Sequence, residues 1–182
     1  MIHGKEVSLR PATKHDRRNI YIWLTTSDLT PSMMGPPAYP DVSIPTWDEF
    51  CGDYMSHFFD GSQPDRGRSF IIEVDGQSIG HISYDGLDSK RSFAELDIWM
   101  RSQVCCGHGY GTDALVALMG HLCDDFEIRK CIVRPSLRNR RAVRAYRKAG
   151  FRSSELSVEE QSRIYGRGEY SDTITLECNI VS

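Results

Sequence analysis

The chain has 182 residues, of which 40% are hydrophobic and 26% are charged, and its formal net charge is −3. This size and composition are typical of one globular domain, which we interpret as residues 1–182. The mildly acidic balance gives no reason to expect a nucleic-acid partner, and no apolar run approaches the roughly 18 residues that span a bilayer. The six cysteines show no Cys-x-x-Cys spacing, so neither a zinc site nor a disulfide framework is expected. We therefore expect no metal. The N-terminus has no apolar signal segment, so we expect a cytoplasmic protein.

The regular elements alternate between strands and helices along the chain. They are expected as a strand at 6–12, helices at 17–24 and 47–59, strands at 69–74, 78–87 and 92–100, a helix at 112–126, a strand at 130–135, a helix at 139–150 and a strand at 170–180. Capping boxes at Thr13/Asp16 and Thr46/Glu49 indicate where the first two helices begin. This order predicts an α/β or α+β fold with helices on the faces of a sheet.

Two connections carry their own signals. Asp75-Gly76 favours a tight hairpin turn between the strands at 69–74 and 78–87. The stretch 30–45 is too rich in proline for regular structure and predicts a long loop.

Three glycines alternate in "CCGHGYGT", Cys105 to Thr112, just before the helix at 112–126. A glycine inside a helix costs about 1 kcal/mol relative to alanine, so their place at a helix start needs another reason. Unpaired N–H groups at a helix N-terminus, with about half a positive charge from the dipole, form an anion site. The spacing fits neither a Walker loop nor a dinucleotide fingerprint. We therefore expect another phosphate-bearing ligand, with a tight turn that binds nothing as the alternative.

The downstream segment "NRRAVRAYRKAGF", Asn139 to Phe151, identifies the family that fits these glycines. Together with "CCGHGYG" and "VSLRPATKHD", it closely resembles the GCN5-related N-acetyltransferase (GNAT) superfamily over nearly the whole chain. The stretches "LRPATKHDRRNIYIWL" and "GQSIGHISY" resemble the branch of aminoglycoside 6′-N-acetyltransferases and ribosomal-protein N-terminal acetyltransferases. The resemblance implies a mixed, mostly antiparallel sheet flanked by helices, and transfer of an acetyl group from acetyl-CoA to a primary amine.

The resemblance also implies a cofactor-binding set. The backbone of the glycine loop would hold the pyrophosphate of acetyl-CoA, and an asparagine would contact its pantetheine. These residues are Cys106, Gly107, His108, Gly109, Tyr110, Gly111 and Thr112, together with Asn139. Cys106 departs from the Arg or Gln that the family usually carries, which leaves open a weakened cofactor site or a binding protein without turnover. Asn139 is equally suited to cap a helix, and the two roles are compatible.

Three residues are expected to act in catalysis. By the resemblance, Tyr146 would protonate the departing thiolate, as a phenol with a pKa near 10 is able to do. Glu95 and Asp97 share one face of their strand by its period of two. In the family, Asp97 matches a residue that holds the acceptor amine, and Glu95 one that acts as a base through water. The alternatives are an aromatic core residue for Tyr146 and a solvated strand face for the two carboxylates.

Charged residues near the expected pocket bear on the identity of the acceptor amine. Arg134 stands where aminoglycoside enzymes generally carry an aspartate, and it suits an acceptor with its own carboxylate or phosphate. Other acidic residues that remain to line a different pocket are Asp41, Asp48, Glu49, Asp53 and Asp85. We expect a small-molecule amine such as an aminoglycoside or a similar polyamine, with a peptide N-terminus as the alternative.

The other partners follow from the charged helix at 139–150. Its basic residues surround the helix, so we expect a solvated face or a cofactor contact in preference to nucleic acid. No membrane partner is expected, and the protein is expected to be a monomer or a homodimer.

Overall fold

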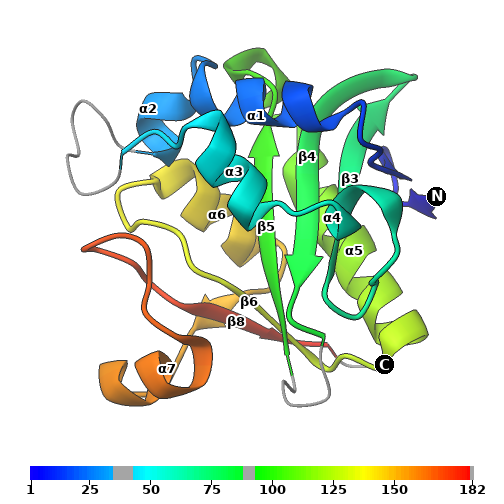
Figure 1. Ribbon diagram of the computed structural model, residues 1–182. Coiled ribbons are helices and arrows are strands. Elements are labelled where there is room, and N and C mark those ends of the chain that lie inside the picture. The colour runs from blue at the N-terminus through cyan, green and yellow to red at the C-terminus, as the bar shows by residue number, and fades with distance from the viewer. Residues whose placement is uncertain (35–42, 88–92, 181–182) are drawn as a thin grey trace.

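The computed structural model describes residues 1–34, 43–87 and 93–180, and its centre is an eight-stranded sheet (Figure 1). The strand order is β1-β2-β3-β4-β5-β6-β8-β7, and among the described strands only β5 and β6 pair in parallel. The strands are β1 (Ile2–His3), β2 (Ser8–Pro11), β3 (Gly67–Val74), β4 (Gln77–Asp85), β5 (Ala94–Met100), β6 (Lys130–Val133), β7 (Arg152–Ser153) and β8 (Leu176–Asn179). The predicted mixed sheet with flanking helices is confirmed.

Helices cover both faces of this sheet. They are α1 (Arg17–Thr25), α2 (Thr30–Met33), α3 (Trp47–Asp53), α4 (His57–Asp60), α5 (Tyr110–Phe126), α6 (Arg140–Lys148) and α7 (Val158–Tyr165), with a 3₁₀ turn η1 (Gln103–Cys105). Figure 1 shows α1, α3 and α4 on one face of the sheet and α5 and α6 on the other.

The hairpin of β3 and β4 divides the core between these two faces. Asp75 and Gly76 have φ angles of 49° and 73°, which match the two positive values that a type I′ turn requires. Along β3 the side chains alternate: Phe70 and Ile72 pack in the cluster that contains α5, and Ile71 packs in the cluster that contains α1 and α3. The predicted hairpin is confirmed.

The N-terminal half differs from prediction at one helix start. Thr46 and Glu49 form a true capping box at the start of α3, as expected. Thr13 and Asp16 form only half of a box, because the Asp16 N–H donates to the Thr13 carbonyl and not to the Thr13 hydroxyl, and α1 begins only after Asp16. Its carboxylate accepts hydrogen bonds from the N–H and hydroxyl of Thr13 and pairs with Arg10 at 3.0 Å. The Asp16 carboxylate thus keeps its expected bond to the Thr13 N–H and also gains a basic partner from β2.

Two further corrections concern segments near the site. The helix predicted over 47–59 is broken at Tyr54, whose φ and ψ of −98° and 73° are not helical. The loop predicted over 30–45 begins with the short helix α2, with Pro31 in its first turn, where no N–H bond is lost. The rest of that loop at 35–42, with Asp41, lies outside the described residues.

The C-terminal part contains elements that were not predicted. Helix α7 opens with a capping box of Ser157 and Glu160, and β7 is a two-residue edge strand. The final strand is shorter than the expected 170–180, because only Leu176–Asn179 form β8. Before it, the chain is irregular and touches the segment after β6 through a Ser136–Thr173 bridge. The irregular segment therefore lies where it can face a site instead of extending the sheet.

Strands β5 and β6 separate soon after they meet. Their register covers two pairs, Ala94 with Cys131 and Glu95 with Ile132. Beyond these pairs the strands diverge toward α5 and α6, the helices that follow them in the chain (Figure 1). This divergence sets the position of the candidate site.

Candidate active site

A cavity of about 1040 Å³ lies beside the diverging strands β5 and β6. Its walls come from α2, α3, β4, β5, the segment after β6, the start of α6 and residues 169–170. Carboxylates dominate its polar lining: Glu49, Asp53, Asp85, Glu95, Asp97 and Glu169. Among the described lining residues, Arg134 is the one basic side chain. Such a balance produces a negative potential that attracts cations.

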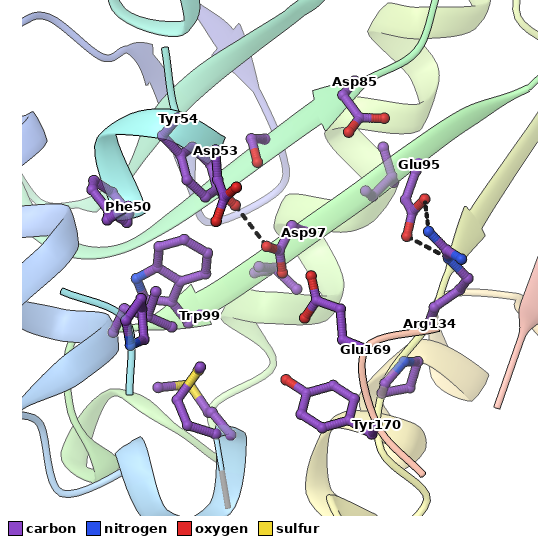
Figure 2. Close-up of a pocket in the computed structure, with 18 of the residues that line it drawn as sticks. Phe50, Asp53, Tyr54, Asp85, Glu95, Asp97, Trp99, Arg134, Glu169 and Tyr170 are labelled. Carbon is purple, nitrogen blue, oxygen red and sulfur yellow. Dashed lines mark hydrogen bonds and ion pairs between the residues drawn. The ribbon is translucent and has the colours of Figure 1, made fainter. Parts of the chain in front are cut away.

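Asp97 lies in the middle of the cavity wall (Figure 2). Along β5, Leu96 and Ile98 pack in the cluster that contains α5, and the alternating Glu95, Asp97 and Trp99 face the cavity, as Figure 2 shows. Asp97 Oδ2 accepts a hydrogen bond of 2.6 Å from the Tyr54 hydroxyl. Enclosure by the protein raises the pKa of Asp97, the charge of Glu95 raises it further, and the Tyr54 bond partly offsets both. The carboxylate remains accessible to solvent through the cavity.

Tyr54 is held in place by aromatic contacts. Its ring stacks on Phe50 at 4.9 Å and meets Trp99 edge-on at 5.7 Å. Desolvation first, and then the Asp97 charge, raise its pKa well above the usual value, so the hydroxyl keeps its proton and donates. Sequence reasoning missed Tyr54 because it placed the residue inside a continuous helix. Gly52, a weak helix former two residues earlier, was the available signal.

Glu95 and Arg134 form a paired unit at one end of the cavity. Arg134 Nε and Nη2 donate to the two carboxylate oxygens at 2.7 and 2.8 Å, and Nη1 donates to the Gly166 carbonyl at 3.1 Å. Burial disfavours the charge of Arg134, but the bonds from Glu95 raise its pKa. Both side chains thus bind protein atoms, whereas sequence analysis had assigned Glu95 to proton transfer and Arg134 to an anionic acceptor.

Glu169 enters the cavity from the irregular segment before β8. Figure 2 shows its carboxylate between Asp97 and Tyr170. Desolvation, followed by the charges of Asp97, Glu95 and Asp53, raises the pKa of Glu169 to about 7. Sequence analysis missed this residue because it adjoins the predicted final strand. The glycines around it in "GRGEYSD" indicated a loop.

Tyr146 and Asn139 reach the cavity from α6. Tyr146 is 6% exposed, and burial, followed by the charges of Asp97 and Tyr170, raises its pKa above the usual value. It therefore stays protonated as a potential donor. Asn139 Oδ1 accepts a bond of 3.2 Å from the Ala142 N–H, which confirms its capping of α6, and the side chain also lines the cavity.

The glycine loop precedes α5, which begins at Tyr110, two residues earlier than expected. Gly107 and Gly109 have φ angles of 87° and 93°, in the region that favours glycine, and a Cβ on either would meet open space. Gly111 lies in the first helical turn, where a Cβ would contact Ile98 and Met100 at 3.8 and 3.9 Å. The N–H groups at this helix start have no acceptor within the helix. The loop therefore presents an accessible backbone.

The remaining side chains of the loop contact their neighbours. The His108 ring stacks on Tyr110 at 5.4 Å, and Cys106 Sγ lies 3.7 Å from the Ser102 carbonyl oxygen. Cys105 and Cys106 are both free thiols. Thr112 lies within the first turn of α5. The candidate cofactor set is thus contiguous in space except for Asn139, which belongs to α6.

A second cavity of about 690 Å³ lies on α6. It is lined by Leu137, Arg138, Arg140, Val143, Arg144, Arg147 and Asp172. Arg138 pairs with Asp172 at 2.9 Å. The basic residues expected all around the helix are therefore partly gathered on one side of it.

The described ranges contain neither a metal-ligand group nor a membrane-spanning helix. Within residues 1–34, 43–87 and 93–180, no group of three or more His, Cys, Asp or Glu side chains is placed to hold a metal ion. No helix in these ranges has the length and apolar character needed to cross a membrane.

The mixed sheet, the glycine loop at the start of α5 and the acidic cavity beside β5 match what the sequence led us to expect of the GNAT class of acetyltransferases. Residues 6–152 match the family described as "Acetyltransferase (GNAT) domain". The chain therefore belongs to this family of acyl-CoA-dependent N-acyltransferases, as its sequence predicted.

The relatives include enzymes for cationic amines. The aminoglycoside N(6′)-acetyltransferases type 1 of Klebsiella pneumoniae and Serratia marcescens are each 28% identical over 171 residues, covering 87% of this chain and 81% of theirs. The structure of AAC(6′)-Ib with ribostamycin and coenzyme A has a TM-score of 0.70 at 22% identity, covering 96% of this chain and 94% of that one. Spermidine N-acetyltransferase from Vibrio cholerae, in complex with CoA and spermine, has a TM-score of 0.68 at 20% identity, covering 96% and 95%. The structural similarities show the fold.

Proposed function

We propose that this protein transfers the acetyl group of acetyl-CoA to a primary amine of a small polycation, such as an aminoglycoside or a linear polyamine. The main support for this proposal is the negative charge of the cavity. Six carboxylates line it, and its one described arginine, Arg134, is already paired with one of them, Glu95. The names of the curated relatives and the amines bound in the similar structures support this class of acceptor.

The described residues fit acetyl-CoA. When bound, this group supplies an acetyl carbonyl activated as a thioester. The open backbone at Gly107 and Gly109, with the free N–H groups that open α5, suits its diphosphate. Asn139 and Tyr146 line the cavity on the side of α6 and are assigned to the pantetheine and the sulfur. The Cys106 side chain is not needed in this arrangement, because the backbone supplies the donors.

The cavity residues divide into binding and proton transfer. Asp97, held by Tyr54, binds the acceptor ammonium and fixes its direction. Tyr146 keeps its proton until a thiolate develops nearby, because burial makes its anion costly. The negative lining beyond Asp97 holds the other cationic groups of the acceptor.

The test is thiol release on mixing the protein and acetyl-CoA with single amines. The panel contains kanamycin, ribostamycin, spermidine, spermine, free amino acids and peptides with the N-terminal sequences of ribosomal proteins. We expect release with the polycations and little with amino acids. Release with peptides alone would favour an N-terminal acetyltransferase. Acetyl-CoA binding by calorimetry without release by any amine would favour a binding protein.

A further inference from the structure

The acceptor of this reaction needs a base close to its nitrogen. Amines of polycations are protonated near neutral pH, and an ammonium has no lone pair with which to attack a carbonyl. The two carboxylates that the sequence assigned to the acceptor are both engaged. Glu95 accepts two bonds from Arg134, and Asp97 accepts the Tyr54 hydroxyl bond. Both carboxylate oxygens of Glu95 are occupied by Arg134, so neither is free to accept a proton from the amine.

Glu169 is placed differently. It lines the same cavity, and its carboxylate faces the space next to Asp97 (Figure 2). No described residue forms a hydrogen bond or an ion pair with it, so its oxygens are available to a ligand. It lies beside Tyr170 on a segment whose position is set by the Ser136–Thr173 bridge and by the Asp172 contact with Ser136 at 2.8 Å.

We propose that Glu169 is the general base of the acetyl transfer, with Asp97 as the group that binds the ammonium; this role rests on the proposed function. A Glu169 oxygen accepts one ammonium proton and passes it to water. The amine nitrogen, now with a lone pair, forms the C–N bond to the acetyl carbon as the C–S bond breaks. The departing sulfur takes a proton from the Tyr146 hydroxyl, and the second proton lost by nitrogen returns to Tyr146 through water. The net products are the amide, the free thiol and one proton.

The electrostatic surroundings suit this role. A general base works best when its pKa lies near the operating pH. Desolvation and the neighbouring negative charges raise the pKa of Glu169 to about 7. The charged and titratable groups that face it are Asp97 and Glu95 on β5, Asp53 on α3, Arg134 after β6, Tyr146 on α6 and Tyr170 beside it. Of these, Arg134 alone lowers the pKa, and its charge is shared with Glu95.

The decisive variant is Glu169→Gln, which keeps the size and polarity of the side chain but cannot accept the proton. With kanamycin and spermidine as probes, we expect kcat to fall by about 10²–10⁴-fold while KM changes little. The acidic limb near pH 7 in the kcat/KM profile should disappear. The difference in kcat between Glu169→Gln and the wild type should also become smaller toward about pH 9–10, where the amine loses its proton to solvent. Glu169→Asp should restore part of the activity.

Two other variants separate this role from binding and from general charge effects. Asp97→Asn should raise KM, because it removes the charge that holds the ammonium. Glu155→Gln is the matched control, since it removes one exposed carboxylate of the same C-terminal part outside the cavity. It should keep the wild-type kcat and pH profile.

The outcomes are distinguishable. If Glu169→Gln has the same kcat as the wild type and keeps the acidic limb of the kcat/KM–pH profile, the role of Glu169 as base is overturned and the proposed function stays intact. A loss of activity in Glu169→Gln that is equal at every pH would also overturn it, because that pattern indicates misfolding or misplacement. Absence of turnover by the wild-type protein with every amine would overturn the proposed function and this role with it.

Discussion

Tyr146 combines burial with access to the cavity. Its hydroxyl is surrounded by protein, and Asp97 and Tyr170 further disfavour the phenolate. Because its pKa is raised above the ordinary value, the phenol can protonate the departing sulfur in the proposed reaction only as the proton lost by nitrogen replaces its own, so that no phenolate accumulates. The residue is thus suited to act late in the reaction and to remain neutral before it.

Replacing Tyr146 by Phe should lower kcat by about 10²–10⁴-fold and leave the affinity for coenzyme A nearly unchanged, because only a hydroxyl is removed. Steady-state kinetics with spermidine and calorimetry with coenzyme A measure the two quantities. A variant with the wild-type kcat would show that water or another group protonates the sulfur.

The pairing of Glu95 with Arg134 shifts the expected effect of its substitution from chemistry to stability. Glu95→Gln removes the charge that balances a largely buried guanidinium, so we expect a loss of roughly 3 kcal/mol in the free energy of unfolding. The double variant Glu95→Gln/Arg134→Leu should lose less than the sum of the single variants, since it leaves no unpaired charge. Urea unfolding of all three measures this coupling, and simple additivity would show that the pair contributes nothing.

At the scale of elements, the start of α5 depends on backbone conformation. Gly109 has a φ of 93° while open space surrounds its missing side chain, so a substitution there acts through strain and not through a clash. The loop and the helix start must keep their relative orientation for the N–H groups to converge on an anion.

Gly109→Val should therefore weaken coenzyme A binding by at least tenfold, because a β-branched residue rarely adopts this conformation. Gly120→Ala is the matched control: it lies in the interior of α5, and its Cβ would meet nothing within 4 Å. It should raise stability by about 1 kcal/mol through helix propensity and leave the affinity unchanged. Equal affinities of both folded variants in calorimetry would exclude a role for the loop in binding the cofactor.

Turn and capping residues predicted correctly those elements whose ends are determined by neighbouring residues in the sequence. The β3–β4 hairpin follows from an Asp-Gly turn, and α6 from its Asn139 cap and its closing glycine at Gly150. By the same reasoning, α7 was within reach, because Ser157 and Glu160 form a visible capping box. The break at Tyr54 was less visible, since packing against Phe50 and Trp99 decides where that residue turns.

The sequence predicted only those site residues that lie at positions of the family motifs. Asp97, Tyr146 and the glycine loop fall on motif positions, and of these Asp97 and Tyr146 line the same cavity. The engagement of Glu95 was not predictable, because Arg134 lies 39 residues away in the chain. Glu169 joins the cavity only through the pairing of the C-terminal segment with the segment after β6, a long-range event with no signature in the local sequence.

At the scale of the whole molecule, the acidic cavity works against folding at high pH. The folded-state pKa of Glu169, about 7, exceeds its ordinary value of 4.5. Its contribution to stability is therefore fully present below pH 4.5 and is lost as the pH rises through 7. Asp16 and Asp113 act in the opposite sense: burial alone would raise their pKa, but their hydrogen bonds lower it, so their stabilisation is lost on acidification.

Glu169→Gln should accordingly be more stable than the wild type at pH 8 and nearly equal to it at pH 5. Urea midpoints at the two pH values measure this difference, with Glu155→Gln as the control that should show none. The same difference at both pH values would show that Glu169 titrates as an ordinary exposed carboxylate. A gain at pH 8 alone would mean that the protein sacrifices stability to keep a base in its cavity.

Because Trp99 contacts Tyr54, its fluorescence can report the binding of a ligand in the cavity. The indole is 4% exposed, and its N–H donates to the Ile20 carbonyl at 3.3 Å, so its orientation is fixed. Its edge-on partner Tyr54 donates to Asp97, where a cationic ligand would arrive. Because the emission of a fixed indole responds to the local electric field, a cation at Asp97 should shift its wavelength. With Trp23 and Trp47 replaced by Phe, fluorescence would follow the filling of the acceptor site in real time, with no reaction taking place.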